Sequence, residues 1–232
     1  MFSRLRLRSR LSSSRKALRP SSSVPLSLYP SIALVVSLLA GCGDMTFFRA
    51  KSDYFPLVPG SRWTYDVGGN TSIDSVVGDS SVADRACVVL LRDYSPEYWS
   101  RQLTALRQYT RLVANRGGED YVLEERYRLV YALPFVEGTT WDESFRDTVV
   151  LVGTDTVLVK DSVSGRVAAI EDVETPAGTF IQCYKVETHR DFEGAEQSFT
   201  TDCTEWFAPG VGLVKRVAGT EAKVLTEYKP GP

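Results

Sequence analysis

The sequence has one histidine, His189, in 232 residues. A Ser–His–Asp or Cys–His nucleophile system would have to use this residue. It lies at the end of an expected strand beside Arg190 and Asp191, so a surface position is the simpler interpretation. A zinc site would need four ligands from one histidine and three scattered cysteines, and neither a Walker A nor a dinucleotide-binding motif is present. We therefore expect no catalytic residue, no metal and no cofactor.

Paired carboxylates at short spacing are also missing. Glu119-Asp120 and Glu124-Glu125 are adjacent in sequence. On strands, neighbouring side chains point to opposite faces, so neither pair can act as one acid/base dyad. A pair formed by residues far apart in sequence stays open, and with it a hydrolase as an alternative function.

The first 41 residues contain no Asp or Glu and no apolar run of 18 or more residues. They hold seven basic residues followed by a short apolar run, 32–39, which is typical of an export signal and too short for a transmembrane helix. Leu39-Ala40-Gly41-Cys42 resembles the lipobox of bacterial lipoproteins, which implies cleavage between Gly41 and Cys42 and acylation of Cys42, palmitate included. An organellar transit peptide is the alternative, because residues 1–23 are rich in Arg and Ser.

Removal of residues 1–41 changes the charge balance. Twenty basic residues then remain against 29 acidic ones, a net charge near −9 with His neutral. This balance argues against a nucleic-acid partner, so membrane attachment is expected through the lipid. We expect a signal peptide at 1–41, a tether at 42–53 and a single domain at 54–232. The residue after Cys42 is Gly43 and not the Asp that favours retention in the inner membrane. In a Gram-negative host this indicates the outer membrane, facing the periplasm.

The domain is expected to be mainly β: a curved antiparallel sheet, as a half-barrel or barrel-like meander, with at most one or two short helices. Segments rich in Val, Thr, Tyr and Phe alternate with turn residues. The expected strands are 62–67, 86–91, 108–114, 121–130, 148–152, 156–160, 166–173, 180–188, 198–207, 212–217 and 223–228. Hairpin turns are expected at 67–70, 115–118, 153–154 and 175–178. The one helix candidate is 95–107, with Ser95 as cap and Pro96 at its first position.

Three cysteines follow Cys42. Cys183 and Cys203 lie symmetrically about Glu193, in the turn-like segment 191–194. In a simple hairpin they would face each other and could form a disulfide in an exported protein. The alternative is that both are small buried residues. Cys87, within Ala-Cys-Val-Val-Leu, is expected in the core.

A weak internal repeat relates residues 55–63 to residues 133–141. Both segments read apolar-Pro-apolar-Val-x-Gly-Ser/Thr-x-Trp. Proline keeps the approach to the strand out of a sheet interior, and glycine permits the turn that precedes the strand. Duplication of a half-sheet and a recurrent way of starting a strand explain the match equally well.

Three segments carry a family resemblance. They are the Tyr-Phe-Pro-Leu…Gly…Trp opening at 54–63, Thr-Pro-Ala-Gly-Thr-Phe at 175–180 and Ala-Pro-Gly-Val-Gly-Leu-Val-Lys at 208–215. Together they resemble a broad group of small exported bacterial lipoproteins of undefined function. The resemblance implies a curved antiparallel sheet, broadly like the half-barrels of lipoprotein-localisation carriers, and it implies no reaction.

The aromatic residues remain as candidates for function. Trp63, Trp141 and Trp206 could line a groove on the concave side of the sheet, unless they pack in the core. We therefore expect a non-catalytic, lipid-anchored protein of the cell envelope that binds an apolar ligand, such as a lipid, or an envelope protein. The alternatives are an envelope hydrolase with a carboxylate pair and a purely structural envelope protein.

Overall fold

The computed structural model describes residues 53–151, 155–194 and 197–232. The predicted signal segment, Gly41, Cys42, most of the tether and the predicted turn at 153–154 lie outside these residues. The described residues form twelve strands in one sheet. The strands are β1 (Arg62–Val67), β2 (Asn70–Val82), β3 (Arg85–Arg92), β4 (Ser95–Arg101), β5 (Ala105–Arg116), β6 (Glu119–Ala132), β7 (Thr140–Val150), β8 (Thr156–Thr175), β9 (Gly178–Glu193), β10 (Ser198–Ala208), β11 (Gly212–Ala218) and β12 (Glu221–Lys229).

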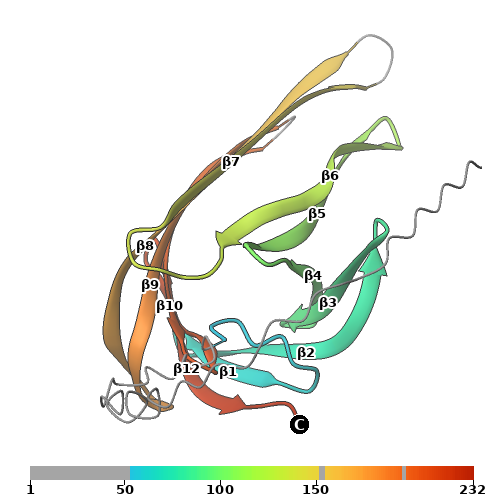
Figure 1. Ribbon diagram of the computed structural model, residues 1–232. Helices are drawn as coiled ribbons and strands as arrows, with labels where there is room; N and C mark the ends of the chain where they lie inside the picture. Colours follow the sequence, from blue (N-terminus) through green and yellow to red (C-terminus); the bar gives the residue numbers. More distant parts are fainter. Residues whose placement is uncertain (1–52, 152–154, 195–196) are drawn as a thin grey trace, which may run out of the picture. The chain divides into compact units, whose positions relative to one another are not determined.

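The strand order is β6-β5-β4-β3-β2-β1-β12-β11-β10-β9-β8-β7. Each strand pairs antiparallel with its neighbours, and the ladder between β1 and β12 joins the two halves of the chain. The sheet curls strongly, so that β5 and β6 lie across from β7 and β8 (Figure 1). The expectation of a curved antiparallel, barrel-like sheet is confirmed.

The helix expected at 95–107 is wrong. Ser95–Arg101 and Ala105–Arg116 are strands β4 and β5, and residues 102–104 connect them. The helical spacing of Trp99, Leu103 and Leu106 is accidental: Trp99 and Leu106 are buried inside the curled sheet, whereas Leu103 is 93% exposed at the connection. Tertiary packing of two short strands prevails here over the local helix pattern.

The predicted hairpin register around Cys183 and Cys203 is also wrong. Glu193 pairs with Ser198, so the centre of the hairpin lies two to three residues later than the symmetric point we assumed. Cys203 therefore opposes Thr188, and both cysteines are buried and unbonded. They occupy the alternative position of small core residues, and Cys87 is buried as expected.

The internal repeat has the same backbone geometry in both copies. Gly60 and Gly138 have positive φ angles of 88° and 84°, and each amide donates to a strand carbonyl 2.9 Å away, Val76 O or Val167 O. In return, the amides of Val76 and Val167 donate to the residue after each glycine. The two copies lead into β1 and β7, the first strands of two six-strand meanders, so the structure favours duplication of a half-sheet.

The sheet is closed by side chains where its two edge strands meet. No ladder joins β6 to β7 in the part of the chain that the structure describes. Instead, the Leu129 amide donates to Glu143 Oε2 at 2.9 Å, and Trp141 Nε1 donates to the Val130 carbonyl at 3.1 Å. Arg126 of β6 also forms an ion pair with Glu143 of β7. We call this line of contacts between β6 and β7 the seam.

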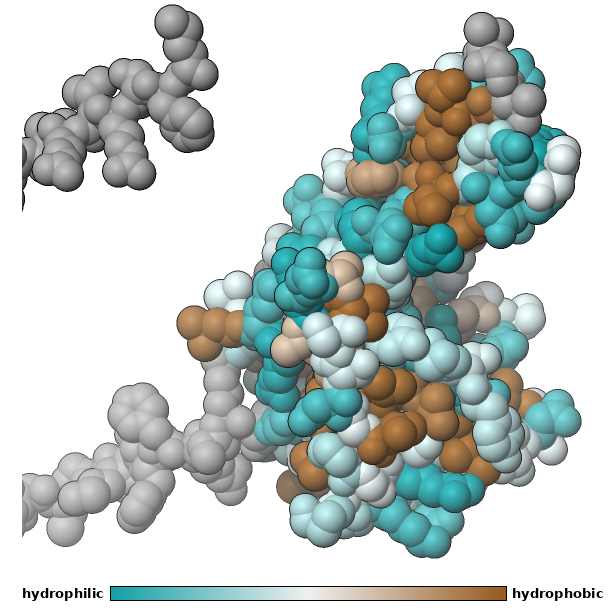
Figure 2. Space-filling model, turned by 90° about the vertical axis from the view of Figure 1, so that its right-hand side faces the viewer, coloured by the Kyte–Doolittle hydropathy of each residue, from teal (hydrophilic) through white to brown (hydrophobic). Residues whose placement is uncertain are grey.

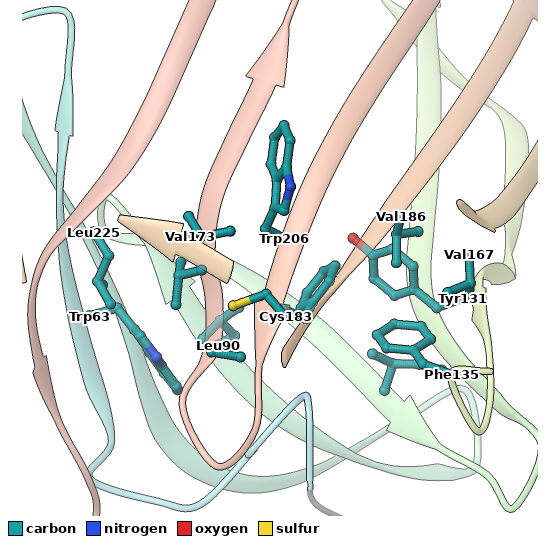
Figure 3. Packing of buried hydrophobic residues seen from close by; sticks show 14 of the residues in the cluster. Trp63, Leu90, Tyr131, Phe135, Val167, Val173, Cys183, Val186, Trp206 and Leu225 are labelled. Atoms are coloured by element: carbon teal, nitrogen blue, oxygen red, sulfur yellow. The ribbon is translucent and has the colours of Figure 1, made fainter. Parts of the chain in front are cut away.

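Two apolar clusters fill the curled sheet. The larger one gathers aromatic and aliphatic side chains from both halves of the chain, among them Trp63, Tyr131, Phe135 and Leu225 (Figure 3). The smaller one is built on Leu123, Leu151, Val159 and Phe192. On the face seen in Figure 2, hydrophilic side chains separate two groups of apolar ones. The two buried clusters share no residue.

Candidate binding cavity

A cavity of about 310 Å³ lies inside the curled sheet. Strands β1 to β6 and strands β8 to β11 contribute side chains to it, and residues 55–57 line it ahead of β1. Its volume is at the lower end of the range in which proteins bind small molecules. The cavity is therefore the candidate binding site.

Much of the cavity wall is aromatic. Phe207 is fully buried, with the ring centroids of Tyr131 and Phe135 5.3 Å away and that of Phe55 6.1 Å away. Trp99 stacks against Tyr131 with centroids 6.4 Å apart. Phe55, Trp99, Tyr131 and Phe207 all line the cavity, and rings offset in this way offer flat apolar surfaces to a ligand.

A balanced set of charges lies around Asp74, which lines the cavity. Lys223 Nζ donates to Asp74 Oδ1 at 3.0 Å, and Arg92 lies 3.3 Å from Glu97 and 3.5 Å from Asp74. Farther along the wall, Arg216 lies 3.6 Å from Glu205. Three cations thus face three carboxylates.

Tyr131 connects this charged set to the aromatic wall. Its hydroxyl donates to Glu205 Oε2 at 2.6 Å. Burial, followed by the nearby charge of Glu205, raises the pKa of Tyr131 well above its ordinary value. The phenol therefore stays a neutral donor that holds Glu205 in place.

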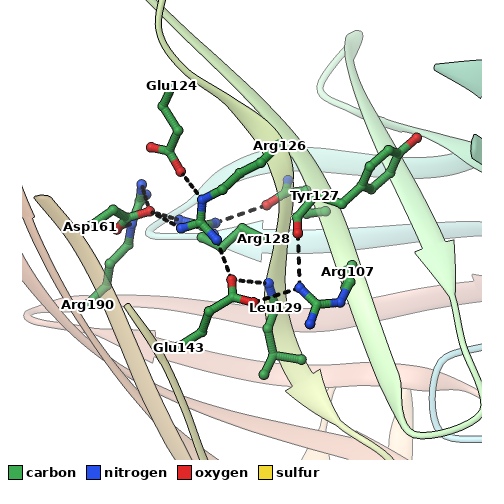
Figure 4. A network of polar contacts seen from close by, with 10 residues as sticks. Arg107, Glu124, Arg126, Tyr127, Arg128, Leu129, Glu143, Asp161 and Arg190 are labelled. Atoms are coloured by element: carbon green, nitrogen blue, oxygen red, sulfur yellow. Dashed lines mark hydrogen bonds and ion pairs between the residues drawn. The ribbon is translucent and has the colours of Figure 1, made fainter. Parts of the chain in front are cut away.

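A second charged set lies at the seam (Figure 4). Asp161 of β8 is fully buried, and its carboxylate accepts from Arg190 Nε at 2.8 Å and from Arg126 Nη2 at 3.4 Å. Arg126 Nε donates to Glu124 at 2.7 Å, and Arg107 Nη1 donates to Glu143 at 2.7 Å. We call this set, completed by Arg128, the seam network.

Arg128 is the least satisfied member of the seam network. Its Nη2 donates to Gln108 Oε1 at 3.2 Å, but Nε and Nη1 are buried without a hydrogen-bond acceptor among the described residues. Nη1 lies 3.8 Å from Asp161 Oδ2, which is too long for a hydrogen bond. Burial, and then the charge of Arg190, lower the pKa of Arg128 below its ordinary value despite Asp161.

The environment shifts the pKa values of two carboxylates of the seam network, Glu124 and Glu143, in opposite directions. Burial and then the charge of Asp161 raise the pKa of Glu124. Partial burial also raises the pKa of Glu143, but hydrogen bonds from the Leu129 amide, Arg107 and Arg126 outweigh it, so its net pKa lies below the ordinary value. Glu143 is therefore the stable acceptor at the seam.

The tryptophans predicted to form a groove separate into different environments. Trp63 lines the cavity, and its Nε1 donates to the Val211 carbonyl at 2.6 Å. Trp141 packs in the core against Gly165, where even a Cβ would lie 2.3 Å from the indole. Trp206 alternates with Glu205 and Phe207, so its side chain points to the opposite face. The predicted groove of three tryptophans is wrong for Trp141 and Trp206, and Trp99 takes a place in the wall instead.

His189 is in an exposed position on β9. Its Nδ1 lies 2.8 Å from Asp202 Oδ1, and its Nε2 lies 3.0 Å from Asp191 Oδ2. The hydrogen bonds with Asp202 and Asp191 raise its pKa. Both ring nitrogens thus face carboxylates, and His189 does not line the cavity.

Sequence reasoning missed the charged residues of the interior. A signal for Asp161 was present, because it lies between Val159 and Val163 at the spacing of side chains that share one face of a strand. Arg126 and Arg128 share a face of β6 in the same way. The alternation shows that these charges point inward, but it does not say which residues they meet.

The comparisons with known proteins cover most of the sheet. A family model described as DUF3108-like matches residues 145–225, from within β7 to within β12. A solved structure of a predicted lipoprotein from Parabacteroides distasonis is similar at 16% identity and a TM-score of 0.45, covering 77% of this chain and 99% of that one. A predicted exported protein with a YmcC-like fold from Bacteroides fragilis gives 14% identity and a TM-score of 0.38, covering 77% and 100%. No curated protein matches the sequence.

The described residues lack two further features. No helix there is long and apolar enough to cross a bilayer. No group of three or more His, Cys, Asp or Glu side chains in that part of the chain is arranged to hold a metal ion.

Proposed function

We propose that the chain is an exported, lipid-anchored protein of the cell envelope that holds an apolar ligand inside its curled sheet. The observation that carries the proposal is the cavity of about 310 Å³ with its wall of Phe55, Trp99, Tyr131 and Phe207. A protein that served only as a spacer would gain stability from filling this space, because empty apolar volume weakens a core.

The cavity also favours binding over hydrolysis. The structure brings Asp161 and Glu124 near each other, which is the long-range carboxylate pair that the sequence left open. Both, however, are held by Arg126, and neither lines the cavity. Glu205 does line it but accepts from Tyr131 and faces Arg216. Carboxylates fixed in this way are suited to structural ion pairs, so the proposal assigns no catalytic residue.

Attachment to the membrane rests on the sequence around Cys42. An acid-free basic segment, a short apolar run and Leu39-Ala40-Gly41-Cys42 support export and acylation. We expect the chain from envelope fractions to begin at Cys42 with added acyl mass, as measured by mass spectrometry of its N-terminal peptide. An unmodified chain that starts elsewhere and washes off the membrane would contradict the anchor and leave the cavity proposal standing.

Ligand binding is testable through the tryptophans of the cavity wall. The full chain is placed in nanodiscs of zwitterionic lipid and titrated with a chain-brominated dodecanol, whose bromine quenches tryptophan fluorescence on contact. We expect saturable quenching that is reduced in Trp99→Phe, because Trp99 and Trp63 are the two tryptophans that line the cavity.

Trp206→Phe is the matched control, since Trp206 lies on the opposite face of β10 and does not line the cavity. It should retain most of the quenching. Equal quenching in both variants would contradict a ligand inside the sheet. Quenching of the same size by a brominated lipid of the bilayer would contradict it as well.

A further inference from the structure

We propose that the ligand is an amphiphile with an oxyanion head group, of the carboxylate class, and that Arg128 is the residue that binds this head group. The inference rests on the proposed function and specifies which chemistry the cavity takes. It is carried by unsatisfied donors, by an uneven charge balance and by the order of side chains along β6.

The first observation is that Arg128 lines the cavity with hydrogen-bond donors to spare. Its side chain is 12% exposed, and Nε and Nη1 have no acceptor among the described residues. A buried donor without a partner costs free energy, and more when the group is charged. A ligand oxyanion that accepts from this guanidinium would remove that cost.

The second observation is the charge of the seam network. Four guanidinium groups, those of Arg107, Arg126, Arg128 and Arg190, share the three carboxylates of Glu124, Glu143 and Asp161. The network therefore has at least one positive charge in excess. The pKa of Glu124 is raised, and protonation of Glu124 would increase this excess. Buried charge of one sign needs a counter-charge.

The charged set around Asp74 does not compete for the anion. Arg92 also has a buried Nε without a hydrogen bond, but that atom lies 3.5 Å from Asp74 Oδ2, and Nη1 lies 3.3 Å from Glu97. Three cations there already face three carboxylates, so a further anion would meet repulsion from Asp74 and Glu97. The excess charge thus selects Arg128.

The third observation is that the wall changes from charged to aromatic within one strand. Arg128 and Tyr131 both lie on β6 and both line the cavity. Three residues of extended chain span roughly 10 Å. A head group at Arg128 therefore places an attached hydrocarbon chain against Tyr131, Trp99 and Phe207.

The experiment compares three probes on the full chain in nanodiscs of zwitterionic lipid, by isothermal titration with empty nanodiscs as background. Decanoate has chain and charge, decanol has the chain alone, and acetate has the charge alone. We expect decanoate to bind more tightly than decanol, and acetate to give no measurable binding. In Arg128→Gln the preference for decanoate over decanol should fall about tenfold or more, the loss expected for one charge-assisted hydrogen bond.

Arg111→Gln is the control variant, because Arg111 is an exposed residue of β5 that does not line the cavity and forms a 3.8 Å ion pair with Glu125. It removes the same charge and should leave the preference unchanged. Near-ultraviolet circular dichroism checks the fold of both variants. Where Arg128→Gln does not fold, the comparison of probes on the unaltered chain still tests the preference for a carboxylate head group.

Each of the other possible results contradicts one part of the proposal. Equal binding of decanol and decanoate, unchanged in Arg128→Gln, would refute the head-group site and leave an apolar cavity. Acetate binding as well as decanoate would show a site for a small free anion rather than for an amphiphile. Absence of binding by all three probes would refute the proposed function itself.

Discussion

Replacing Asp161 by asparagine is expected to lower the free energy of unfolding by about 3–5 kcal/mol. Asp161 is fully buried, and its two oxygens meet the guanidinium groups of Arg126, Arg128 and Arg190. The amide keeps the size of the side chain but leaves three cations with one carboxylate fewer. Unfolding by urea, followed by tryptophan fluorescence, measures the loss.

The matched control is Glu193→Gln. Glu193 pairs with Lys160, the residue next to Asp161, in an exposed ion pair of 2.6 Å. An exposed ion pair contributes about 0–1 kcal/mol, so this variant should be close to the unaltered protein. Similar losses in both variants would mean that Asp161 is not the buried anchor of the seam network.

Truncating Phe207 to alanine is expected to cost about 3–5 kcal/mol of unfolding free energy, with a smaller cost for Phe207→Leu. The ring is fully buried among Phe55, Tyr131 and Phe135, and its removal leaves a hole next to the existing cavity. The same denaturation measurement applies. Because the hole joins the cavity, a longer amphiphile should also regain some of the lost stability by binding there.

Ile181→Ala is the control for this series. Ile181 lies on β9 with 65% of its surface exposed, so its truncation should change stability by about 0.5 kcal/mol or less. A loss below about 1 kcal/mol for Phe207→Ala would contradict a packed aromatic wall around the cavity.

Much of the fold follows from local signals in the sequence. The turns at Gly68-Gly69 and Gly117-Gly118 have positive φ angles in the structure. Strands β1, β5 and β6, which flank them, were predicted within three residues, whereas β2, which follows Gly69, was not predicted. Two hairpins lack this signal. Ala83-Asp84 and Asp93-Tyr94 make two-residue turns with positive φ angles of 48° to 70° at residues other than glycine. The second turn lies directly before β4, which explains why that strand was mistaken for the start of a helix.

The polar strand β2 and the pair Cys183 and Cys203 show where prediction from local sequence fails. Asn70–Val82 has few large apolar residues, and its position is fixed by pairing with β1 and β3 rather than by its own pattern. The hairpin between β9 and β10 is set by where its turn begins, and a shift of a few residues moves Cys203 from Cys183 to Thr188. Register is a property of pairs of strands, so one strand's sequence does not determine it.

The candidate site depends even more on distant pairing. Arg126 meets Asp161, 35 residues later, only because the sheet curls until β6 lies against β8. Alternation along each strand predicts that both side chains point inward, but not that they meet. The sequence indicated that aromatic residues line the site. It did not show that β4 places Trp99 against Tyr131.

The most direct test of the account is a crystal structure of the protein with a fatty acid brominated near the end of its chain, in which anomalous scattering locates the bromine. We expect the bromine inside the curled sheet near Phe207 and Trp99, with the carboxylate within hydrogen-bond distance of Arg128. A bromine on the outer face of the sheet, or a cavity that stays closed to the ligand at saturating concentration, would contradict the account.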